Sequence, residues 1–435
     1  MRAANSRVGA SPTSHQLMSS TDIDAKSVAR LAPTHDFSAK LRQPALLGRV
    51  VDYVDWQRRV RAAKAKGQAV PEMPEWSPLS INLDLTTACN YRCDHCIDWD
   101  ILNSPIKYDF AKLKASLTDM VDRGLRSVIL IGGGEPTLHP GFEETVHHLK
   151  DLGTQVSIVS NGSRNYRIFD IIDRLDSHDW VRLSLDSGTN ETFERMHKPT
   201  KAISLDEICE WVPRIRKRNP EPLVGFSFII VWDGAEREEG VDVVPNIDEI
   251  VSAAKRARDY GFNYISLKPF LSRRPDGSEV MDAAAVANLD HTVARIRAAV
   301  DEAKKLETDT FSVTESINLR VLEQGNWKDF TKQPSMCHMQ PLRQVLTPLG
   351  LYNCPAHRGV DRALIGPKAA WADADARGDT ARSTAAMLEG FDASKECSEV
   401  TCLYHGVNWW LEDVIRERAE LSEADAIDER FDYFL

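Results

Sequence analysis

The sequence predicts an α/β fold in which one parallel sheet curls into a barrel or part of one, followed by a small Cys-containing domain. Strand-like and helix-like segments alternate from residue 79 to about residue 306. Beyond about Glu307 the pattern weakens, and residues 331–405 are instead rich in Pro, Gly and Cys. Six consecutive β-then-α units indicate a parallel sheet covered by helices, and right-handed crossovers bend such a sheet.

Each predicted strand is a short run with many β-branched residues, and each predicted helix has apolar residues three or four positions apart. The strands are expected at 81–85, 127–131, 155–159, 180–185, 224–231 and 264–269. The helices that follow them are expected at 110–124, 142–153, 166–175, 205–218, 247–261 and 283–306. Active sites of parallel α/β folds lie at the carboxyl ends of the strands, so the residues that follow each strand are the candidates for chemistry.

Composition divides the rest of the chain. Residues 1–45 begin with a Ser- and Ala-rich stretch that lacks a secretory apolar run, so we expect a disordered segment, with a transit peptide as the alternative. Residues 46–78 are expected to form a helical extension and a Pro-rich linker, and residues 79–310 the barrel core. Residues 311–405 are expected to form the small domain, and residues 406–435 a closing helix and an acidic tail.

The charge and composition exclude several classes of protein. The 435 residues carry a formal net charge of −11, which argues against binding to nucleic acid through its phosphate backbone. No apolar stretch approaches the roughly 18 residues of a membrane span. Eight cysteines are too few for a disulfide scaffold. We therefore expect a cytoplasmic protein, in which clustered cysteines bind metal or do redox chemistry.

Three of the cysteines follow the first predicted strand at close spacing. Cys89, Cys93 and Cys96 form a C-x3-C-x2-C pattern. Three thiolates in one short loop can bind one side of a compact iron–sulfur cluster. If the cluster has four irons, one iron stays open for a ligand that is not protein. The alternative is a zinc site completed by His95 or by a distant residue.

Polar residues also follow the next three strands. The second strand ends in Gly132-Gly133-Gly134-Glu135-Pro136, where glycines allow a close approach and Glu135 could receive an ammonium group. The third strand ends in Ser160-Asn161-Gly162, and the fourth in Ser184-Leu185-Asp186. Such side chains at one rim suit a ribose and a carboxylate, although Asn-Gly and Asp-Ser-Gly are also ordinary turn formers.

Together these motifs resemble the radical S-adenosylmethionine (SAM) superfamily over roughly residues 79–306. The resemblance implies a partial (βα)6 TIM-like barrel and a [4Fe-4S] cluster bound by Cys89, Cys93 and Cys96. It also implies that SAM chelates the open iron and yields a 5′-deoxyadenosyl radical that abstracts hydrogen from a substrate. The implied SAM-binding residues are His95, Gly133, Gly134, Glu135, Asn161, Ser184 and Asp186. At Lys268 the resemblance is to backbone contacts with adenine, so its side chain is not expected to take part.

Four more cysteines lie in the aperiodic segment. They are Cys337, Cys354, Cys397 and Cys402, and the stretch that ends at Cys354 is typical of a hairpin. The segment resembles the auxiliary-cluster domain of many radical SAM enzymes, the SPASM domain or its smaller twitch form. This resemblance implies one auxiliary [4Fe-4S] cluster. A zinc site is the alternative, with His357 available as a ligand. The eighth, Cys209, is expected in the apolar core.

The resulting prediction is a radical SAM oxidoreductase or epimerase that acts on a sugar or aminocyclitol, with an auxiliary cluster that assists electron transfer. The resemblance also implies an external electron donor such as flavodoxin or ferredoxin. The first alternative is a radical SAM maturase that modifies a ribosomally made peptide. The alternatives from other classes are a non-catalytic iron–sulfur electron carrier and a zinc-stabilised binding protein. No membrane or nucleic-acid partner is expected.

Overall fold

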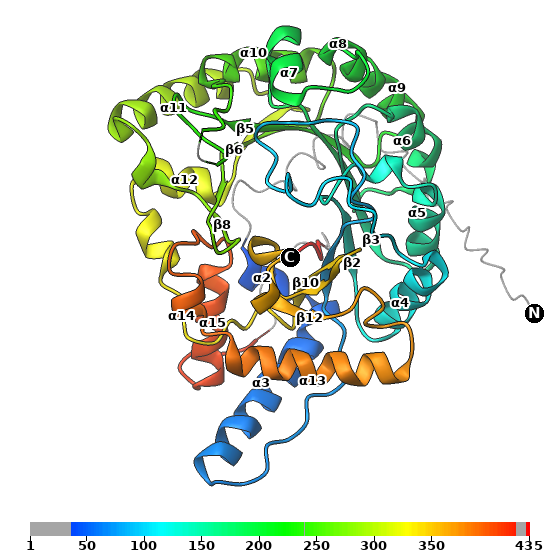
Figure 1. The fold of residues 1–435 in the computed structure, drawn as a ribbon, viewed down its shortest axis with the longest axis vertical. Coiled ribbons are helices and arrows are strands. Elements are labelled where there is room, and N and C mark those ends of the chain that lie inside the picture. The colour runs from blue at the N-terminus through cyan, green and yellow to red at the C-terminus, as the bar shows by residue number, and fades with distance from the viewer. Residues whose placement is uncertain (1–35, 239, 423–431) are drawn as a thin grey trace, which may run out of the picture.

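One curved sheet forms the framework of the molecule. The computed structural model describes residues 36–238, 240–422 and 432–435. Among these residues, ten strands form a sheet in the order β12-β11-β10-β1-β2-β3-β4-β5-β6-β9. Figure 1 looks into the curve of this sheet and shows the helices α4 to α12 arranged around its outside. This arrangement confirms the predicted α/β fold.

The six predicted strands are all present and run parallel. They are β1 (Ser80–Leu83), β2 (Ser127–Leu130), β3 (Gln155–Ser160), β4 (Trp180–Ser184), β5 (Leu223–Ile230) and β6 (Tyr264–Pro269). The helices between and after them are α4 (Phe110–Asp122), α5 (Phe142–Asp151), α6 (Asn165–Ile171), α7 (Asn190–His197), α8 (Leu205–Cys209), α9 (Trp211–Arg218), α10 (Ile250–Asp259) and α11 (Leu289–Lys304). Cys209 is fully buried in the apolar cluster that these elements share, as expected.

The segment after residue 310 extends the same sheet. β9 (Ser312–Glu315) pairs in parallel with β6, and β10 (Arg343–Thr347) pairs in parallel with β1. β11 (Gly350–Tyr352) completes the predicted hairpin, and β12 (Leu364–Gly366) follows it. Residues 311–405 therefore do not form a sheet of their own. Strands this short carry too few alternating residues to give a clear pattern.

Helices cover the remaining part of this segment. They are α12 (Ile317–Gln324), α13 (Ala374–Gly390), α14 (Ala393–Glu396) and α15 (His405–Ile415). Earlier in the chain, after β6, β7 (Ser272–Arg273) and β8 (Glu279–Val280) form a small antiparallel ribbon.

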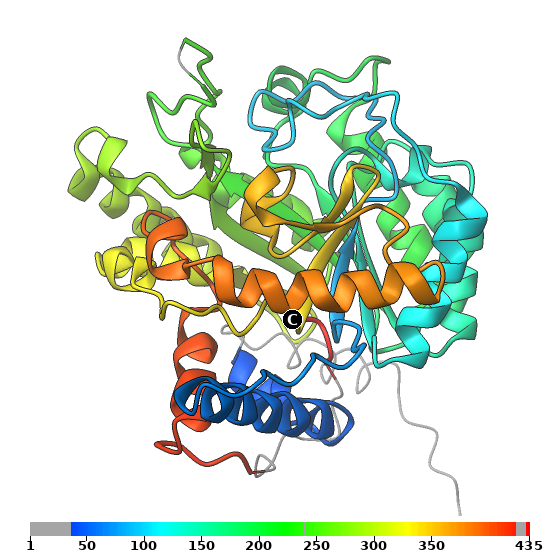
Figure 2. The ribbon, with the colours of Figure 1, turned by 60° about the horizontal axis from the view of Figure 1, so that its bottom comes forward.

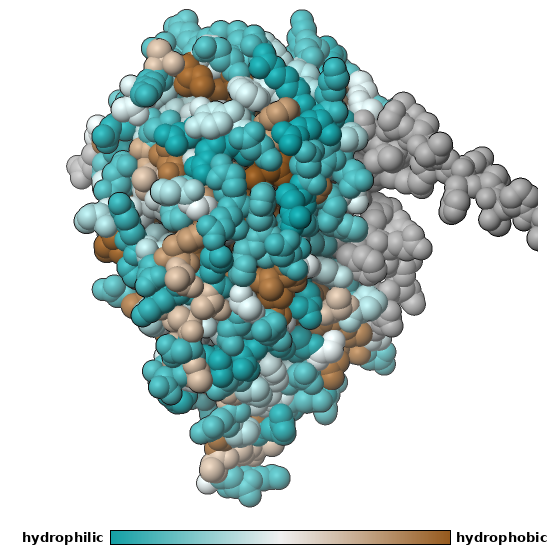
Figure 3. All heavy atoms as spheres, turned by 90° about the vertical axis from the view of Figure 1, so that its right-hand side faces the viewer, coloured by the Kyte–Doolittle hydropathy of each residue, from teal (hydrophilic) through white to brown (hydrophobic). Residues whose placement is uncertain are grey.

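The face of the molecule in Figure 3 is mostly hydrophilic, with apolar side chains in small separate patches. No helix in the described ranges combines the length and apolarity needed to cross a bilayer.

The first described residues are helical, which corrects part of the sequence prediction. α2 (Phe37–Leu41) and α3 (Pro44–Ala65) occupy a stretch of which residues 36–45 were expected to be disordered. Asp36 caps α2 through the amide of Ala39, and Phe37 and Leu41 are buried. Both helices pack with α15 in a second apolar cluster, and this tertiary contact outweighs the weak local signal. Residues 1–35 and most of the expected acidic tail lie outside the described residues.

The last four residues close the barrel at the amino ends of its strands. The carbonyl of Tyr433 accepts a hydrogen bond from Ser127 Oγ at 2.7 Å, and the amide of Tyr433 donates to Gln155 Oε1 at 2.9 Å. The ring of Phe434 lies 5.5 Å from that of Trp180, centroid to centroid. Figure 2 shows this end of the chain between the sheet and the helices α2 and α3. The opposite end of the barrel, at the carboxyl ends of the strands, is where the predicted site residues lie.

Candidate active site

The loop after β1 brings three thiols to one cavity. Cys89, Cys93 and Cys96 are half-buried, free thiols, and all three line a cavity of about 730 Å³ inside the barrel. The loop is anchored to its surroundings, because the amide of Cys89 donates to Asn103 Oδ1 at 3.1 Å and that of Arg92 to the carbonyl of His197. Burial raises the pKa of Cys89 to about 11 and that of Cys96 to about 12. Thiolates here therefore need a positive partner such as a metal.

Two buried histidines lie beside this loop. His95 Nε2 contacts Asp186 Oδ2 at 3.0 Å, while His197 Nδ1 contacts Cys93 Sγ at 3.2 Å. His197 Nε2 lies 3.0 Å from the carbonyl of Leu185, so it donates there. Burial alone would raise the pKa of Asp186, but hydrogen bonds from His95 and from the amide of Ile229 keep it below its ordinary value. His95 and Asp186, both predicted as SAM-binding residues, thus bind each other.

Glu135 has a fixed orientation at the cavity wall. One carboxylate oxygen accepts from Thr137 Oγ1 at 2.6 Å and from Ser160 Oγ at 2.8 Å. The other oxygen accepts from the amide of Asn161 at 2.7 Å. Burial raises the pKa of Glu135 despite these donors. The carboxyl group therefore joins the ends of β2 and β3 and still borders the cavity, where it can receive a cation.

The other predicted contacts divide into two groups. Ser184 and Gly134 line the cavity, as a ligand-binding role requires. Asn161 also lines the cavity, but its side-chain Nδ2 donates to Asn90 Oδ1 at 3.0 Å and so supports the cysteine loop. Gly133 does not border the cavity. Its contact with SAM stays a prediction.

The glycine run is required by a buried ion pair. Gly132 and Gly133 have φ angles of +67° and +64°, which favour glycine. A Cβ at Gly133 would lie 2.9 Å from Asp84 Oδ2, and one at Gly132 would collide with Arg358 Nη1. Asp84 and Arg358 contact each other at 3.1 Å. The run therefore makes room for this pair, whereas the sequence suggested room for a ligand.

Comparison with known proteins agrees with this geometry. A family model described as the Radical SAM superfamily matches residues 83–244, which run from the last residue of β1 to beyond the end of β5 and contain the three thiols and Glu135. Residues 83–244 form a radical SAM domain. This family uses a [4Fe-4S] cluster and SAM. The matched residues end before β6, so the family model covers only part of the barrel.

Two relatives match shorter parts of the chain. An S-adenosylmethionine-dependent nucleotide dehydratase from a Thermoplasmatales archaeon is 36% identical over 110 residues, 25% of this chain and 38% of that protein. The mycofactocin maturase MftC of Mycobacterium tuberculosis is 32% identical over 117 residues, 26% of this chain and 29% of that protein. The chain thus spans well under half of each relative's length. Both matches support the radical SAM domain, and neither covers the whole chain.

A solved structure resembles more of the chain. The crystal structure of SuiB from Streptococcus suis bound to S-adenosylmethionine has a TM-score of 0.51 and 12% identity, and covers 74% of this chain and 70% of that protein. At this identity the likeness concerns the fold alone. It covers a larger share of the chain than residues 83–244 do.

A buried cation links the radical SAM domain to the C-terminal segment. Arg358 lies four residues after Cys354 and contacts Asp84 at 3.1 Å, Asp98 at 2.6 Å and Glu279 at 3.9 Å. Three carboxylates surround this guanidinium, which leaves excess negative charge. Burial, only partly offset by Arg358, raises the pKa of both Asp84 and Glu279 to about 7. No pattern in the sequence indicated that these residues meet.

The raised pKa of Glu279 predicts a pH-dependent effect. Replacing Glu279 with glutamine is expected to increase the free energy of unfolding by about 1–3 kcal/mol at pH 8 and hardly at all at pH 5. The unfolded chain loses this proton near the ordinary value of 4.5, whereas the folded protein keeps it up to about pH 7. The cost of the buried charge therefore grows between these pH values and is constant above them.

Urea unfolding of the unsubstituted protein and of the Glu279→Gln variant at pH 5 and pH 8 measures this change in the free energy of unfolding. Glu302→Gln, which changes an exposed glutamate paired with Lys305, is the control and should have little effect at either pH. A larger stabilisation by Glu279→Gln at pH 5 than at pH 8 would contradict the prediction.

The second group of cysteines also converges. Cys337 precedes β10, Cys354 follows β11, Cys397 follows α14, and Cys402 precedes α15. Burial, and then repulsion among the four thiols themselves, raises the pKa of Cys397 well above its ordinary value. The pKa of Cys402 is raised in the same way by burial and by Cys354 and Cys337. The four thiols therefore lie close enough to influence one another's charge.

His357 lies beside this group of cysteines. Its Nε2 is 3.5 Å from Cys397 Sγ, so an imidazole is available next to the four thiols. Among the described residues, three possible metal-ligand atoms that all lie within 4.8 Å of one another belong to Cys93, His95 and His197.

Sequence reasoning missed several residues of this cavity. Arg182 and Lys268 both line it, although the first was not considered and the second was expected to contribute backbone only. The signal for Arg182 was present, since a charged residue in the apolar strand Trp180–Ser184 points away from the apolar face. His197 and Arg358 gave no comparable signal, because each acts through partners far away in the sequence.

Proposed function

We propose that this protein binds a [4Fe-4S] cluster through Cys89, Cys93 and Cys96, cleaves SAM reductively beside it, and removes hydrogen from a small-molecule substrate in the barrel. The observation that carries this proposal is that the three thiols and Glu135 border one cavity. The thiols are too poorly solvated to ionise alone, which suits residues whose charge is balanced by a cluster.

The residues of the cavity have separate roles in this proposal. When bound, the cluster supplies the electron that splits SAM into methionine and a 5′-deoxyadenosyl radical. Glu135 binds the ammonium group of SAM, because its carboxylate is fixed at the cavity wall by Thr137, Ser160 and Asn161. Ser184 is open to the cavity and can donate a hydrogen bond to the carboxylate of SAM. The closed amino end of the barrel keeps solvent from the reacting atoms.

The cavity favours a small substrate. A volume of about 730 Å³ lies in the usual range for small-molecule sites. Polar groups line its inner wall at several levels, which suits a polar molecule such as a sugar or aminocyclitol. A peptide substrate is the second candidate, and the match of residues in the radical SAM domain to a protein named mycofactocin maturase favours it.

The second group of cysteines is proposed to bind an auxiliary cluster. Replacing Cys402 with serine is expected to lower the iron content by about four per chain and to leave SAM cleavage measurable. The reason is that Cys402 belongs to the C-terminal group, whereas the thiols proposed to act on SAM lie after β1. Iron assay and chromatography of 5′-deoxyadenosine measure the two effects. Loss of SAM cleavage together with all of the iron would contradict the separation of the two sites.

Anaerobic reconstitution with iron and sulfide tests the function as a whole. We expect about eight iron and eight sulfide per chain, and formation of 5′-deoxyadenosine from SAM with dithionite or with a flavodoxin system. A protein that binds zinc at Cys93, His95 and His197 and does not cleave SAM would contradict the proposal. Iron binding without SAM cleavage would instead indicate an electron carrier.

A further inference from the structure

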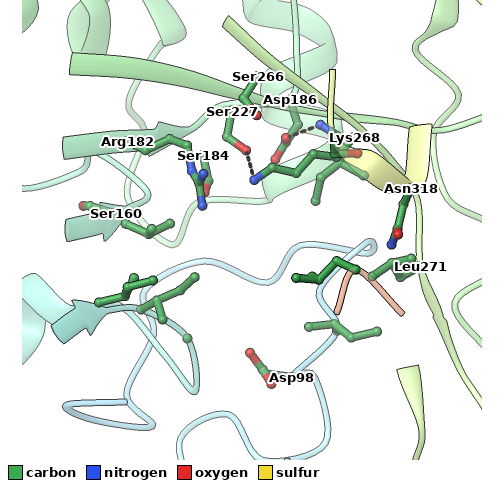
Figure 4. Close-up of a pocket in the computed structure, with 18 of the residues that line it drawn as sticks. Asp98, Ser160, Arg182, Ser184, Asp186, Ser227, Ser266, Lys268, Leu271 and Asn318 are labelled. Carbon is green, nitrogen blue, oxygen red and sulfur yellow. Dashed lines mark hydrogen bonds between the residues drawn. The ribbon is translucent and has the colours of Figure 1, made fainter. Parts of the chain in front are cut away.

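Two cations point into the interior of the barrel at different depths. In the register of the sheet, Arg182 of β4 lies beside Gly225 of β5, and Lys268 of β6 lies beside Ile229. Between these levels, three serines occupy neighbouring positions on adjacent strands: Ser184, Ser227 and Ser266. Figure 4 shows all five polar side chains around the same space. The inner wall on this side is therefore cationic and rich in hydroxyl groups.

Neither cation has a carboxylate partner. No ion pair joins Arg182 or Lys268 to an acidic side chain of the described residues. Arg182 lies over the ring of Trp180, with 4.9 Å from Cζ to the ring centroid, and its Nε is buried without a hydrogen-bond partner. Lys268 Nζ donates to Ser227 Oγ at 3.3 Å, a weak contact for an ammonium group. Burial and the nearby charge of Arg182 lower the pKa of Lys268 well below its ordinary value. An anion bound on this wall would balance the charge of Arg182 and would favour protonation of the Lys268 amine.

The acidic residues around the cavity are already engaged. Asp186 accepts from His95 and from the amide of Ile229, and Glu135 accepts from three neighbouring residues. Asp98 pairs with Arg358, and Glu315 with Lys304. Each of these carboxylates lines the same cavity. None of them is placed to neutralise both Arg182 and Lys268.

We propose that Arg182 and Lys268 bind an anionic group of the substrate, a phosphate or a carboxylate. This inference rests on the proposed function and specifies the substrate of the same cavity. Guanidinium and ammonium groups give strong, charge-assisted hydrogen bonds to both kinds of anion. The hydroxyls of Ser227 and Ser266 can donate to the remaining oxygens. Because Arg182 lies two strand residues on the amino side of the three serines and Lys268 two residues on their carboxyl side, an anion bound by both cations lies near the level of the serines.

An aldehyde that carries a phosphate group tests this site. Pyridoxal phosphate condenses with a neutral lysine amine, water leaves, and borohydride then reduces the imine to a stable amine that peptide mass spectrometry can locate. On the reconstituted protein with SAM bound, we expect pyridoxal phosphate to label Lys268 at least about tenfold faster than pyridoxal, which lacks the phosphate. Burial lowers the pKa of Lys268, which increases the fraction of neutral, reactive amine at a given pH.

Variants test whether the preference of Lys268 for pyridoxal phosphate over pyridoxal depends on Arg182. Arg182→Met should remove the advantage of pyridoxal phosphate over pyridoxal, whereas Arg182→Lys should keep part of it. Arg59→Met, which changes an exposed arginine on α3, should leave it intact. Protection of Lys268 by inorganic phosphate would identify a phosphate site, and protection by malonate but not phosphate a carboxylate site. Equal labelling by the two aldehydes, or an unchanged ratio in Arg182→Met, would overturn the proposal.

Two further outcomes distinguish this proposal from the proposed function. Complete protection of Lys268 by SAM alone would assign the cations to the carboxylate of SAM and would overturn the substrate site. The same preparations are assayed for 5′-deoxyadenosine. Selective labelling without SAM cleavage would support the anion site and contradict the proposed function, while SAM cleavage without selective labelling would contradict the anion site alone.

Discussion

Replacing Cys89, Cys93 and Cys96 together with alanine is expected to abolish the formation of 5′-deoxyadenosine from SAM. The same change should lower the iron and sulfide content by about four each per chain, because the C-terminal thiols remain. The physical reason is that the three side chains line the cavity together, and no other cysteine of the described residues lines it. Iron and sulfide assays and chromatography of the reaction products, all under anaerobic conditions, measure the effect.

Cys209 provides the matched control. This thiol is fully buried in the apolar core and belongs to neither group of cysteines, so Cys209→Ala should keep both the iron content and SAM cleavage. Far-ultraviolet circular dichroism of the triple variant shows whether it remains folded. A folded triple variant that still cleaves SAM would refute the assignment of these three thiols.

Replacing Arg358 with methionine is expected to lower the free energy of unfolding by about 3–5 kcal/mol. Methionine keeps much of the volume but removes the cation that contacts Asp84, Asp98 and Glu279. The three carboxylates would then be buried around an uncharged side chain. Because burial already raises the pKa of Asp84 and Glu279 to about 7, the loss should be smaller at pH 6 than at pH 8.

The nearby Arg362 is the control for the loss of a positive charge in this segment. Arg362 lies in the same segment and pairs with Asp276 and Glu396 nearer the surface, so Arg362→Met should cost about 1 kcal/mol or less. Adding Asp84→Asn to Arg358→Met removes one buried charge and should recover part of the stability. Urea unfolding measures all four proteins. Equal losses in the two arginine variants would contradict the proposed role of Arg358.

The elements that were predicted correctly are those with strong local patterns. β5 (Leu223–Ile230) is a mostly apolar run and β6 (Tyr264–Pro269) alternates apolar with polar residues, and both were expected within a few residues of their bounds. The hairpin of β10 and β11 was also expected, because a Pro-Leu-Gly turn separates its strands. By contrast, α2 has only five residues, and its burial depends on α15, more than 360 residues later in the chain. A helix this short has no stable existence without such a contact.

The same division holds in the candidate site. The spacing of Cys89, Cys93 and Cys96 was sufficient to predict one metal-binding loop, because a short loop limits how far apart three side chains can lie. The partners of the site residues could not be predicted. His95 binds Asp186 across 91 residues, and Arg358 contacts Asp84 across 274.

The sequence by itself therefore determined the class of fold, the loop of three thiols and the second group of four cysteines. These features depend on local spacing and on the alternation of apolar residues, which a chain carries without reference to its partners. Only the tertiary structure decided that the glycine run accommodates the pair of Asp84 and Arg358, and that two unpaired cations share the interior with the proposed cluster site. Burial and the pairing of charges depend on which strands become neighbours, and that is a property of the folded molecule.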